Sequence, residues 1–273
     1  MRIGVVAPGR PIDPTVATRV QAFTAMLYPQ VEIVFHPQCY LSAGHFAGTD
    51  EERARAFLEV ANDPKYDAIW FARGGYGSNR ILRAVMPNLG PAAGHKTYMG
   101  FSDMGFIMGA LYARRIGKQV HASMPISLGR NDPGDSNAWA LDWLVNKDRK
   151  VLEPSLADGR PAAAFNLAIL TSMVGTPWLP DLTDHVLMIE EVDEPLYRID
   201  RMLFQMAHAT QLKGIAGVRL GAISNIQLND PPFNEAPEQM ILRWCKEMGV
   251  PFLGRAEIGH IEGNKVVPFG VVT

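Results

Sequence analysis

The 273-residue sequence contains few cysteines, no excess of charge of either sign and no long apolar run. Its two cysteines, Cys39 and Cys245, lie far apart and outside any Cys-x-x-Cys pattern, which argues against a disulfide framework, a zinc ribbon and a redox dithiol. The 26 Lys and Arg residues nearly balance 28 Asp and Glu residues without clustering, so nothing indicates nucleic acid binding. Because no apolar run suits a secretory signal or a membrane span, we expect a cytoplasmic protein that acts on a small molecule or peptide.

Several motifs that would indicate a known chemistry are also missing. The phosphate-binding patterns G-x-x-x-x-G-K-[ST] and G-x-G-x-x-G do not occur, which argues against mononucleotide and dinucleotide binding. The G-x-S-x-G elbow of α/β-hydrolases is absent as well, because Met104 occupies the position of its second glycine. We therefore expect no cofactor and no metal ion.

Short apolar runs alternate with helical patterns in the first half of the chain, which predicts a parallel, doubly wound α/β sheet. Strands are expected at residues 3–7, 31–35, 68–72, 98–100 and 119–120, and helices at 15–27, 51–61, 79–85 and 103–115. Ligands of such sheets bind at the carboxyl ends of the strands, so functional residues are expected there.

This alternation stops after residue 125, where turn formers at 131–135 and 154–161 flank a predicted helix at 138–145. We therefore predict a first domain at 1–128, a linker at 129–162 and a second domain at 163–273. Helices are expected in the second domain at 166–174, 196–208 and 237–248, and strands at 185–189, 218–223, 251–254 and 265–268.

The segment 98–105 reads as a strand, a sharp turn at Ser102 and the start of a helix. A serine at such a turn lies at the carboxyl end of a strand beside free backbone N–H groups, as an acyl-transfer nucleophile requires. The alternative is that Ser102 only caps the helix.

A serine nucleophile needs a base and a carboxylate that orients it. Among the seven histidines, His121 follows the fifth predicted strand at the sheet edge of Ser102, and His260 lies in a glycine-flanked loop. Glu190 and Glu191 end a continuous apolar strand and are the candidate carboxylates. The alternative for both glutamates is that the strand reaches water at this point.

The segment Arg73-Gly74-Gly75-Tyr76-Gly77 follows another predicted strand. Its glycines allow the backbone N–H groups to converge on an anion, which favours an oxyanion hole or a pocket for a substrate carboxylate. A tight turn with Ser78 as a helix cap is the alternative.

Together these segments resemble the LD-carboxypeptidases, serine peptidases that remove the terminal D-alanine from murein tetrapeptides, with the microcin C immunity peptidases as a sister branch. The resemblance covers nearly the whole chain in order: 73–77, 100–103, 166–167, 175–177, 190–191, 197–203, 259–260 and 268–270. The chain departs from the family pattern at Met104-Gly105, at Ala122-Ser123 after His121, and at Ala164-Phe165, which concerns the shape of the pocket. It also lacks the long linker insertion of the microcin-directed branch.

The resemblance implies a catalytic triad of Ser102, Glu190 and His260, and thus favours His260 over His121 and Glu190 over Glu191. It also implies a flavodoxin-like parallel-sheet N-terminal domain, a smaller α/β C-terminal domain, a peptide substrate and a homodimer.

Within this scheme the backbone N–H groups of Asp103, Gly74 and Gly75 are the expected oxyanion hole, and Arg73 and Tyr76 are candidate substrate-binding residues. Two alternatives remain at this point. The same triad could hydrolyse a peptidyl-nucleotide or acyl-amino-acid conjugate, or the protein could be a non-catalytic module that binds a small anion.

Overall fold

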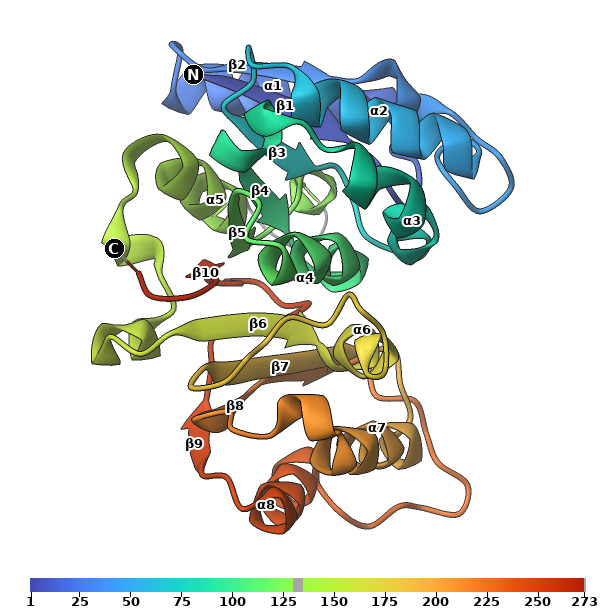
Figure 1. The fold of residues 1–273 in the computed structure, drawn as a ribbon, viewed down its shortest axis with the longest axis vertical. Coiled ribbons are helices and arrows are strands. Elements are labelled where there is room, and N and C mark those ends of the chain that lie inside the picture. Colours follow the sequence, from blue (N-terminus) through green and yellow to red (C-terminus); the bar gives the residue numbers. More distant parts are fainter. Residues whose placement is uncertain (130–134, 273) are drawn as a thin grey trace.

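The computed structural model describes residues 1–129 and 135–272. It contains two β-sheets, one in each half of the molecule, and each sheet is flanked by helices (Figure 1). Most of the predicted break at 131–135 lies outside the described residues. The first sheet has six strands and the second has four, so the predicted α/β architecture with a smaller second unit is confirmed.

The first sheet has the strand order β10-β5-β4-β3-β1-β2. Strands β1 to β5 are parallel and follow the flavodoxin-like order that the family resemblance implied. Their bounds are Arg2–Val6, Glu32–Phe35, Ala68–Phe71, Thr97–Gly100 and Lys118–His121, within two residues of the prediction. The carboxyl ends of β3, β4 and β5 therefore bring the glycine segment, Ser102 and His121 to one edge.

Local sequence signals account for the helices around this sheet. Helix α1 (Pro14–Leu27) begins after Asp13, whose carboxylate accepts from the Thr15 N–H, and α2 (Asp50–Asn62) begins with a capping box between Thr49 and Glu52. The helix predicted at 79–85 is a 3₁₀ turn at Ser78–Ile81 followed by the short α3 (Leu82–Val85). Helices α4 (Gly105–Ala113) and α5 (Asp135–Asn146) complete this half.

The second sheet is parallel and has the order β6-β7-β8-β9. Its strands are Ala162–Asn166, Val186–Val192, Gly217–Ser224 and Phe252–Arg255, and its helices are α6 (Leu167–Met173), α7 (Leu196–His208) and α8 (Pro237–Met248). The prediction missed β6 and placed Asn166 inside a helix. Asn166 instead caps α6, where its side chain accepts from the Ile169 N–H.

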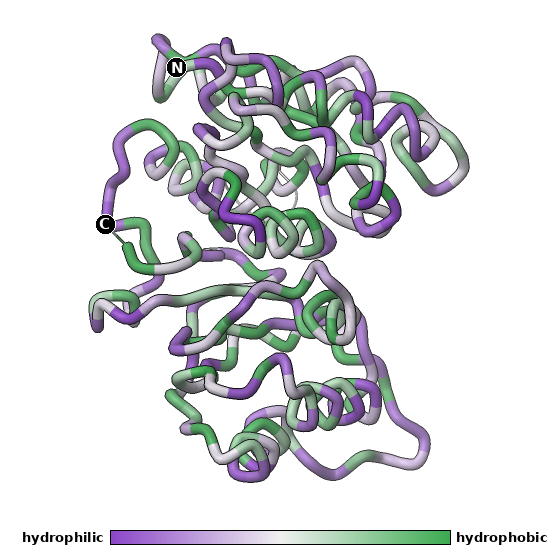
Figure 2. Tube along the Cα trace, viewed as in Figure 1, coloured by the Kyte–Doolittle hydropathy of each residue, from purple (hydrophilic) through white to green (hydrophobic). Residues whose placement is uncertain are grey.

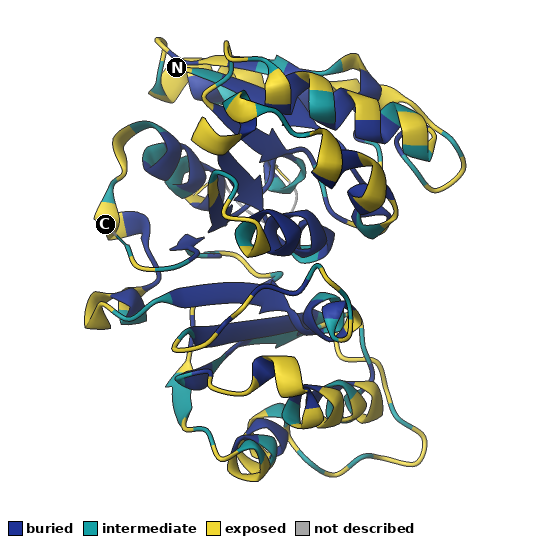
Figure 3. Cartoon of the chain, in the orientation of Figure 1, coloured by how far each residue is buried: buried dark blue, intermediate teal, exposed yellow. Residues whose placement is uncertain are grey.

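The two sheets are joined by the chain's last strand, β10 (Val267–Pro268), which pairs antiparallel with β5. Just beyond it, Gly270 bridges to Ala162 at the start of β6, so this segment lies between the sheets (Figure 1). The central strands of both sheets are almost wholly buried, whereas the edge strand β9 is partly exposed and α7 and α8 carry an exposed outer face (Figures 2 and 3). Within the described ranges, every helix is too short or too polar to cross a lipid bilayer.

Candidate active site

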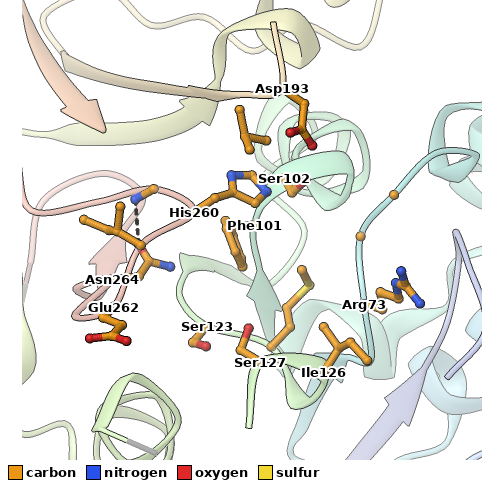
Figure 4. A pocket seen from close by; sticks show the side chains of 16 residues that line it. Arg73, Phe101, Ser102, Ser123, Ile126, Ser127, Asp193, His260, Glu262 and Asn264 are labelled. Atoms are coloured by element: carbon orange, nitrogen blue, oxygen red, sulfur yellow. Dashed lines mark hydrogen bonds between the residues drawn. The ribbon is translucent and has the colours of Figure 1, made fainter. Parts of the chain in front are cut away.

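A pocket of about 590 Å³ lies at the junction of the two halves. Its walls come from the glycine segment after β3, the turn after β4, the segment after β5, the end of β7 and the loop 259–264. Figure 4 shows Phe101, Ser102 and His260 at its centre, with the charged side chains of Arg73, Asp193 and Glu262 around them. The carboxyl ends of both parallel sheets thus contribute to one site.

Ser102 occupies the sharp turn that the sequence indicated, between β4 and a 3₁₀ turn that leads into α4. Its backbone has a φ of 59°, a left-handed conformation that is rare for a residue with a side chain and recurs at functional sites. Neither the 3₁₀ turn nor α4 has a side-chain cap, so the capping alternative for Ser102 is wrong.

His260 also lines the pocket and is hydrogen-bonded to Glu190 near the end of β7. Its Nδ1 lies 2.8 Å from Oε2 of Glu190, whose side chain is completely buried while that of His260 is 25% exposed. Burial alone lowers the pKa of the imidazole, but Glu190, helped by Glu191 and Asp193, outweighs this effect and raises the pKa. Because Nδ1–H donates to the carboxylate, Nε2 is left as the proton acceptor.

The other candidate base, His121, is completely buried at the end of β5 and is absent from the described pocket wall. The Phe101 ring lies against both imidazoles, with centroids 5.5 Å from His121 and 4.8 Å from His260. Burial lowers the pKa of His121 to about 4, so this side chain is neutral near pH 7. The structure therefore brings His260, and not His121, into the pocket with Ser102.

Glu191 binds the start of α6 and not His260. Its carboxylate accepts from the Asn166 side chain at 2.7 Å and from the Ala168 N–H at 2.8 Å, at the positive end of the helix dipole. Burial raises the pKa of Glu191 despite these bonds. Glu190 and Glu191 are 0% and 2% exposed, so the strand does not end in water here, and that alternative is wrong.

The glycine segment is held against the serine turn by Asp103 and Ser78. The buried Asp103 carboxylate accepts from the Ser78 N–H at 3.0 Å, and the Ser78 hydroxyl donates to the Asp103 carbonyl at 2.6 Å. Burial raises the pKa of Asp103. A Cβ at Gly74 would lie 3.1 Å from both Cβ and Oγ of Ser102, so a larger residue there would press on the serine side chain. Ser78 is thus a tether between the two loops and not a helix cap.

The remaining predicted residues fall in different places. Gly75, with a φ of 101°, and Arg73 line the pocket, and an Arg73 guanidinium N–H donates to the Pro11 carbonyl at 3.3 Å. Tyr76 is half exposed and packs near Phe46, and among the described residues it is not part of the pocket wall.

Several residues of the pocket wall were not singled out from the sequence, among them the polar residues Asp193, Glu262 and Asn264. Their places in the chain, just after the glutamate pair and just after His260, were the available signal. Among residues 1–129 and 135–272, no three His, Cys, Asp or Glu side chains are grouped as metal ligands.

Comparison with known proteins gives a consistent result. The model of the LD-carboxypeptidase N-terminal domain matches residues 3–122, and that of the LD-carboxypeptidase C-terminal domain matches 162–273. A protein of Synechocystis sp. named as a carboxypeptidase is 31% identical over 249 residues, 88% of this chain and 79% of the relative. The murein tetrapeptide carboxypeptidase of Pseudomonas aeruginosa is 25% identical, with 98% of this chain and 91% of the relative aligned.

Solved structures share the fold. The crystal structure of muramoyltetrapeptide carboxypeptidase from Oxalobacter formigenes superposes with a TM-score of 0.81 at 23% identity, covering 99% of this chain and 93% of that one. MccF in complex with glutamyl sulfamoyl guanosine gives a TM-score of 0.77 at 17% identity, covering 99% and 91%. The domain matches and the Synechocystis relative confirm the predicted family and an enzymatic activity. The chain belongs to the LD-carboxypeptidase family of peptide hydrolases.

Proposed function

We propose that this enzyme is a serine carboxypeptidase that cleaves the bond between an L-centre and the terminal D-alanine of murein tetrapeptides. The observation that carries the proposal is the pairing of His260 with the fully buried Glu190, in the same pocket as the strained Ser102 turn. The aligned Pseudomonas relative supports the choice of substrate.

In the proposed mechanism Nε2 of His260 removes the proton from Ser102 as Oγ attacks the scissile carbonyl. Glu190 holds the imidazole through Nδ1–H and stabilises its positive charge. His260 then protonates the departing D-alanine amine, and the acyl group is released when water attacks by the reverse route. In the first stage the Ser102 Oγ–carbon bond forms and the peptide C–N bond breaks. In the second stage a bond from water to the same carbon forms and the Oγ–carbon bond breaks.

The oxyanion is assigned to the backbone N–H groups of Asp103 and of Gly74 or Gly75. The Asp103–Ser78 bonds support this assignment, because they fix the glycine segment against the serine turn before substrate binds. A single donor of this kind contributes about 3 kcal/mol to transition-state stabilisation in comparable enzymes.

A carboxypeptidase also has to bind a free carboxylate, and we assign this role to Arg73 together with the N–H groups that follow Gly74. Arg73 is the only lysine or arginine in the described pocket wall, and its guanidinium can bind a carboxylate through two N–H groups. The half-exposed Tyr76, which lies outside the described pocket wall, is the second substrate-binding residue of the proposal.

The setting of the reaction belongs to the same proposal. We assign the enzyme to murein recycling in the cytoplasm, as a homodimer, with a nucleophile domain at 1–128, a linker at 129–162 and a domain at 163–273 that supplies Glu190 and His260. The family models, which match 3–122 and 162–273, support this division. Light scattering on the purified protein tests the dimer, since a monomeric mass at micromolar concentration contradicts it.

The test of the activity is a chromatographic assay of D-alanine release from murein tetrapeptide, with an aminoacyl sulfamoyl nucleoside conjugate as the competing substrate. We expect the tetrapeptide to be cleaved and Ser102→Ala and His260→Ala to be inactive while remaining folded. Preferential cleavage of the conjugate would overturn the substrate assignment, and an active His260→Ala would overturn the triad.

A further inference from the structure

His121 and Asn264 are two buried polar side chains close to His260 that the proposed mechanism does not use. His121 is 0% exposed and ends β5 in the first sheet, whereas Asn264 is 2% exposed and lies in the loop that carries His260. A buried polar group costs free energy unless it is hydrogen-bonded, so the bonds between these residues indicate what they do.

One oxygen atom connects them. Oδ1 of Asn264 accepts from the Gly259 N–H at 3.0 Å and lies 3.1 Å from Nε2 of His121 (Figure 4 shows the Gly259 bond). Because a backbone N–H can only donate, the Asn264 atom that faces it must be the oxygen. The same oxygen then requires a proton on Nε2 of His121. The neutral state that follows from the lowered pKa of His121 fits this arrangement, with a single N–H directed at Asn264.

The bond acts next to the catalytic histidine. Gly259 directly precedes His260 and has a φ of 131°, where a side chain would be strained. A Cβ at Gly259 would also lie 3.0 Å from the Ala222 Cβ and 3.3 Å from the Glu190 Cβ. The backbone before His260 is therefore packed against the strand that supplies Glu190, and the Asn264 oxygen fixes it from the other side.

The same segment is anchored in the first sheet. Val267, three residues after Asn264, pairs with His121 as β10 adds to β5, and the Phe101 ring contacts both the His121 and the His260 imidazole. His121 is thus attached to the sheet that carries Ser102, and Asn264 to the loop that carries His260.

We propose that His121 and Asn264 are positioning residues: the His121 Nε2–H, through the Asn264 side-chain oxygen, sets the Gly259–His260 backbone so that His260 faces both Ser102 and Glu190. The inference rests on the proposed role of His260. It gives His121 a function as a neutral hydrogen-bond donor that couples the two halves of the site.

The experiment compares Asn264→Leu, His121→Leu and His121→Gln with the wild-type enzyme. Leucine keeps the branched shape of Asn264 and roughly the volume of His121 and removes the hydrogen bond, whereas the Gln side chain can place an N–H near the position of Nε2. Rates are divided by the fraction of active sites titrated with a fluorophosphonate, so that unfolded protein does not count. Asn62→Leu is the matched control, because Asn62 accepts from the Gly90 N–H at 2.7 Å far from the pocket.

We expect both leucine variants to lower kcat by about 10- to 100-fold with a KM close to that of the wild type, because a base displaced by about 1 Å loses this much rate. The acidic limb of kcat/KM against pH moves to lower pH, since a displaced His260 loses the carboxylate that raises its pKa. His121→Gln restores most of kcat and the acidic limb, and Asn62→Leu changes neither.

A purely structural role would lower the melting temperature and leave the pH profile of the titrated sites unchanged, and that result overturns the proposal. Equal rates for His121→Leu and His121→Gln also overturn it, even if Asn264→Leu fails to fold. His260→Ala distinguishes a wrong positioning role from a wrong assignment of the base. If this variant is inactive while the leucine variants behave as wild type, only the positioning role is wrong; if it is active, the proposed base is wrong.

Discussion

Replacing Glu190 with Gln tests how much the buried carboxylate contributes to catalysis. The change keeps the volume of the side chain and removes one negative charge that lies 2.8 Å from Nδ1 of His260. When His260 takes the proton from Ser102, charge centres about 4 Å apart attract by about 4 kcal/mol at an effective dielectric constant of about 20. Since about 1.4 kcal/mol corresponds to a tenfold change in rate, kcat should fall about 10³-fold.

The pH dependence of the same variant provides a second, independent measurement. His260 must be neutral to act as a base, so activity in the wild type is lost as the pH falls through its raised pKa. Without the Glu190 charge, burial is the dominant effect and lowers the pKa of the imidazole. The acidic limb of kcat/KM for D-alanine release should therefore move to lower pH in Glu190→Gln.

The chain offers a matched control at its surface. His36 and Glu59 form a hydrogen bond with an Nε2–Oε2 distance of 2.9 Å, almost the same as in the buried pair, but the Glu59 side chain is 55% exposed. Glu59→Gln should leave kcat and the pH profile unchanged. A Glu190→Gln enzyme that loses less than about 10-fold in kcat, with its acidic limb in place, would refute the electrostatic argument.

Four further predictions concern the rest of the site. Gly74→Ala should abolish activity in a folded protein, because the methyl group lies 3.1 Å from Ser102 Oγ, whereas Gly94→Ala, with open space around it, should be silent in the same assay. Arg73→Ala should cost much more kcat/KM on peptides with a free carboxyl terminus than on amidated ones, and equal losses would remove Arg73 from carboxylate binding. A fluorophosphonate should label Ser102 stoichiometrically, as peptide mapping will reveal. Glu191→Gln should lower the melting temperature through the α6 cap while kcat falls far less than in Glu190→Gln.

The strands of the first sheet could be predicted because each is a short apolar run bounded by turn formers, and their parallel order places functional residues at one edge. Strand β6 was missed because its sequence, Ala-Ala-Ala-Phe-Asn, has little strand propensity of its own. It forms through partners distant in the chain, pairing with β7 along its length and bridging to Gly270 at its start.

The sequence indicated which residues could form the site, but not which of them interact with one another. From the residues alone, His121 and His260 were both acceptable bases, and so were Glu190 and Glu191 as carboxylates; only the family resemblance favoured one of each. Burial and pairing separate them, since His121 is bonded to Asn264 and Glu191 to the start of α6. These contacts join residues 23 to 143 positions apart, and local sequence patterns do not specify them.

Gly105 and Phe165, two positions at which the chain departs from the family pattern, lie next to each other in the structure. A Cβ at Gly105, where the family usually has threonine, would lie 3.1 Å from Ile169 Cγ2 and 3.4 Å from Phe165 Cδ1. Phe165 in turn occupies a position where the family usually has glycine, and its ring also lies beside Gly109. Ile169 and Phe165 therefore pack against the side of α4 that carries Gly105, and α4 and α6 are in contact. Since α4 follows Ser102 and Glu191 accepts from the Ala168 N–H at the start of α6, this packing connects the serine turn with the end of β7.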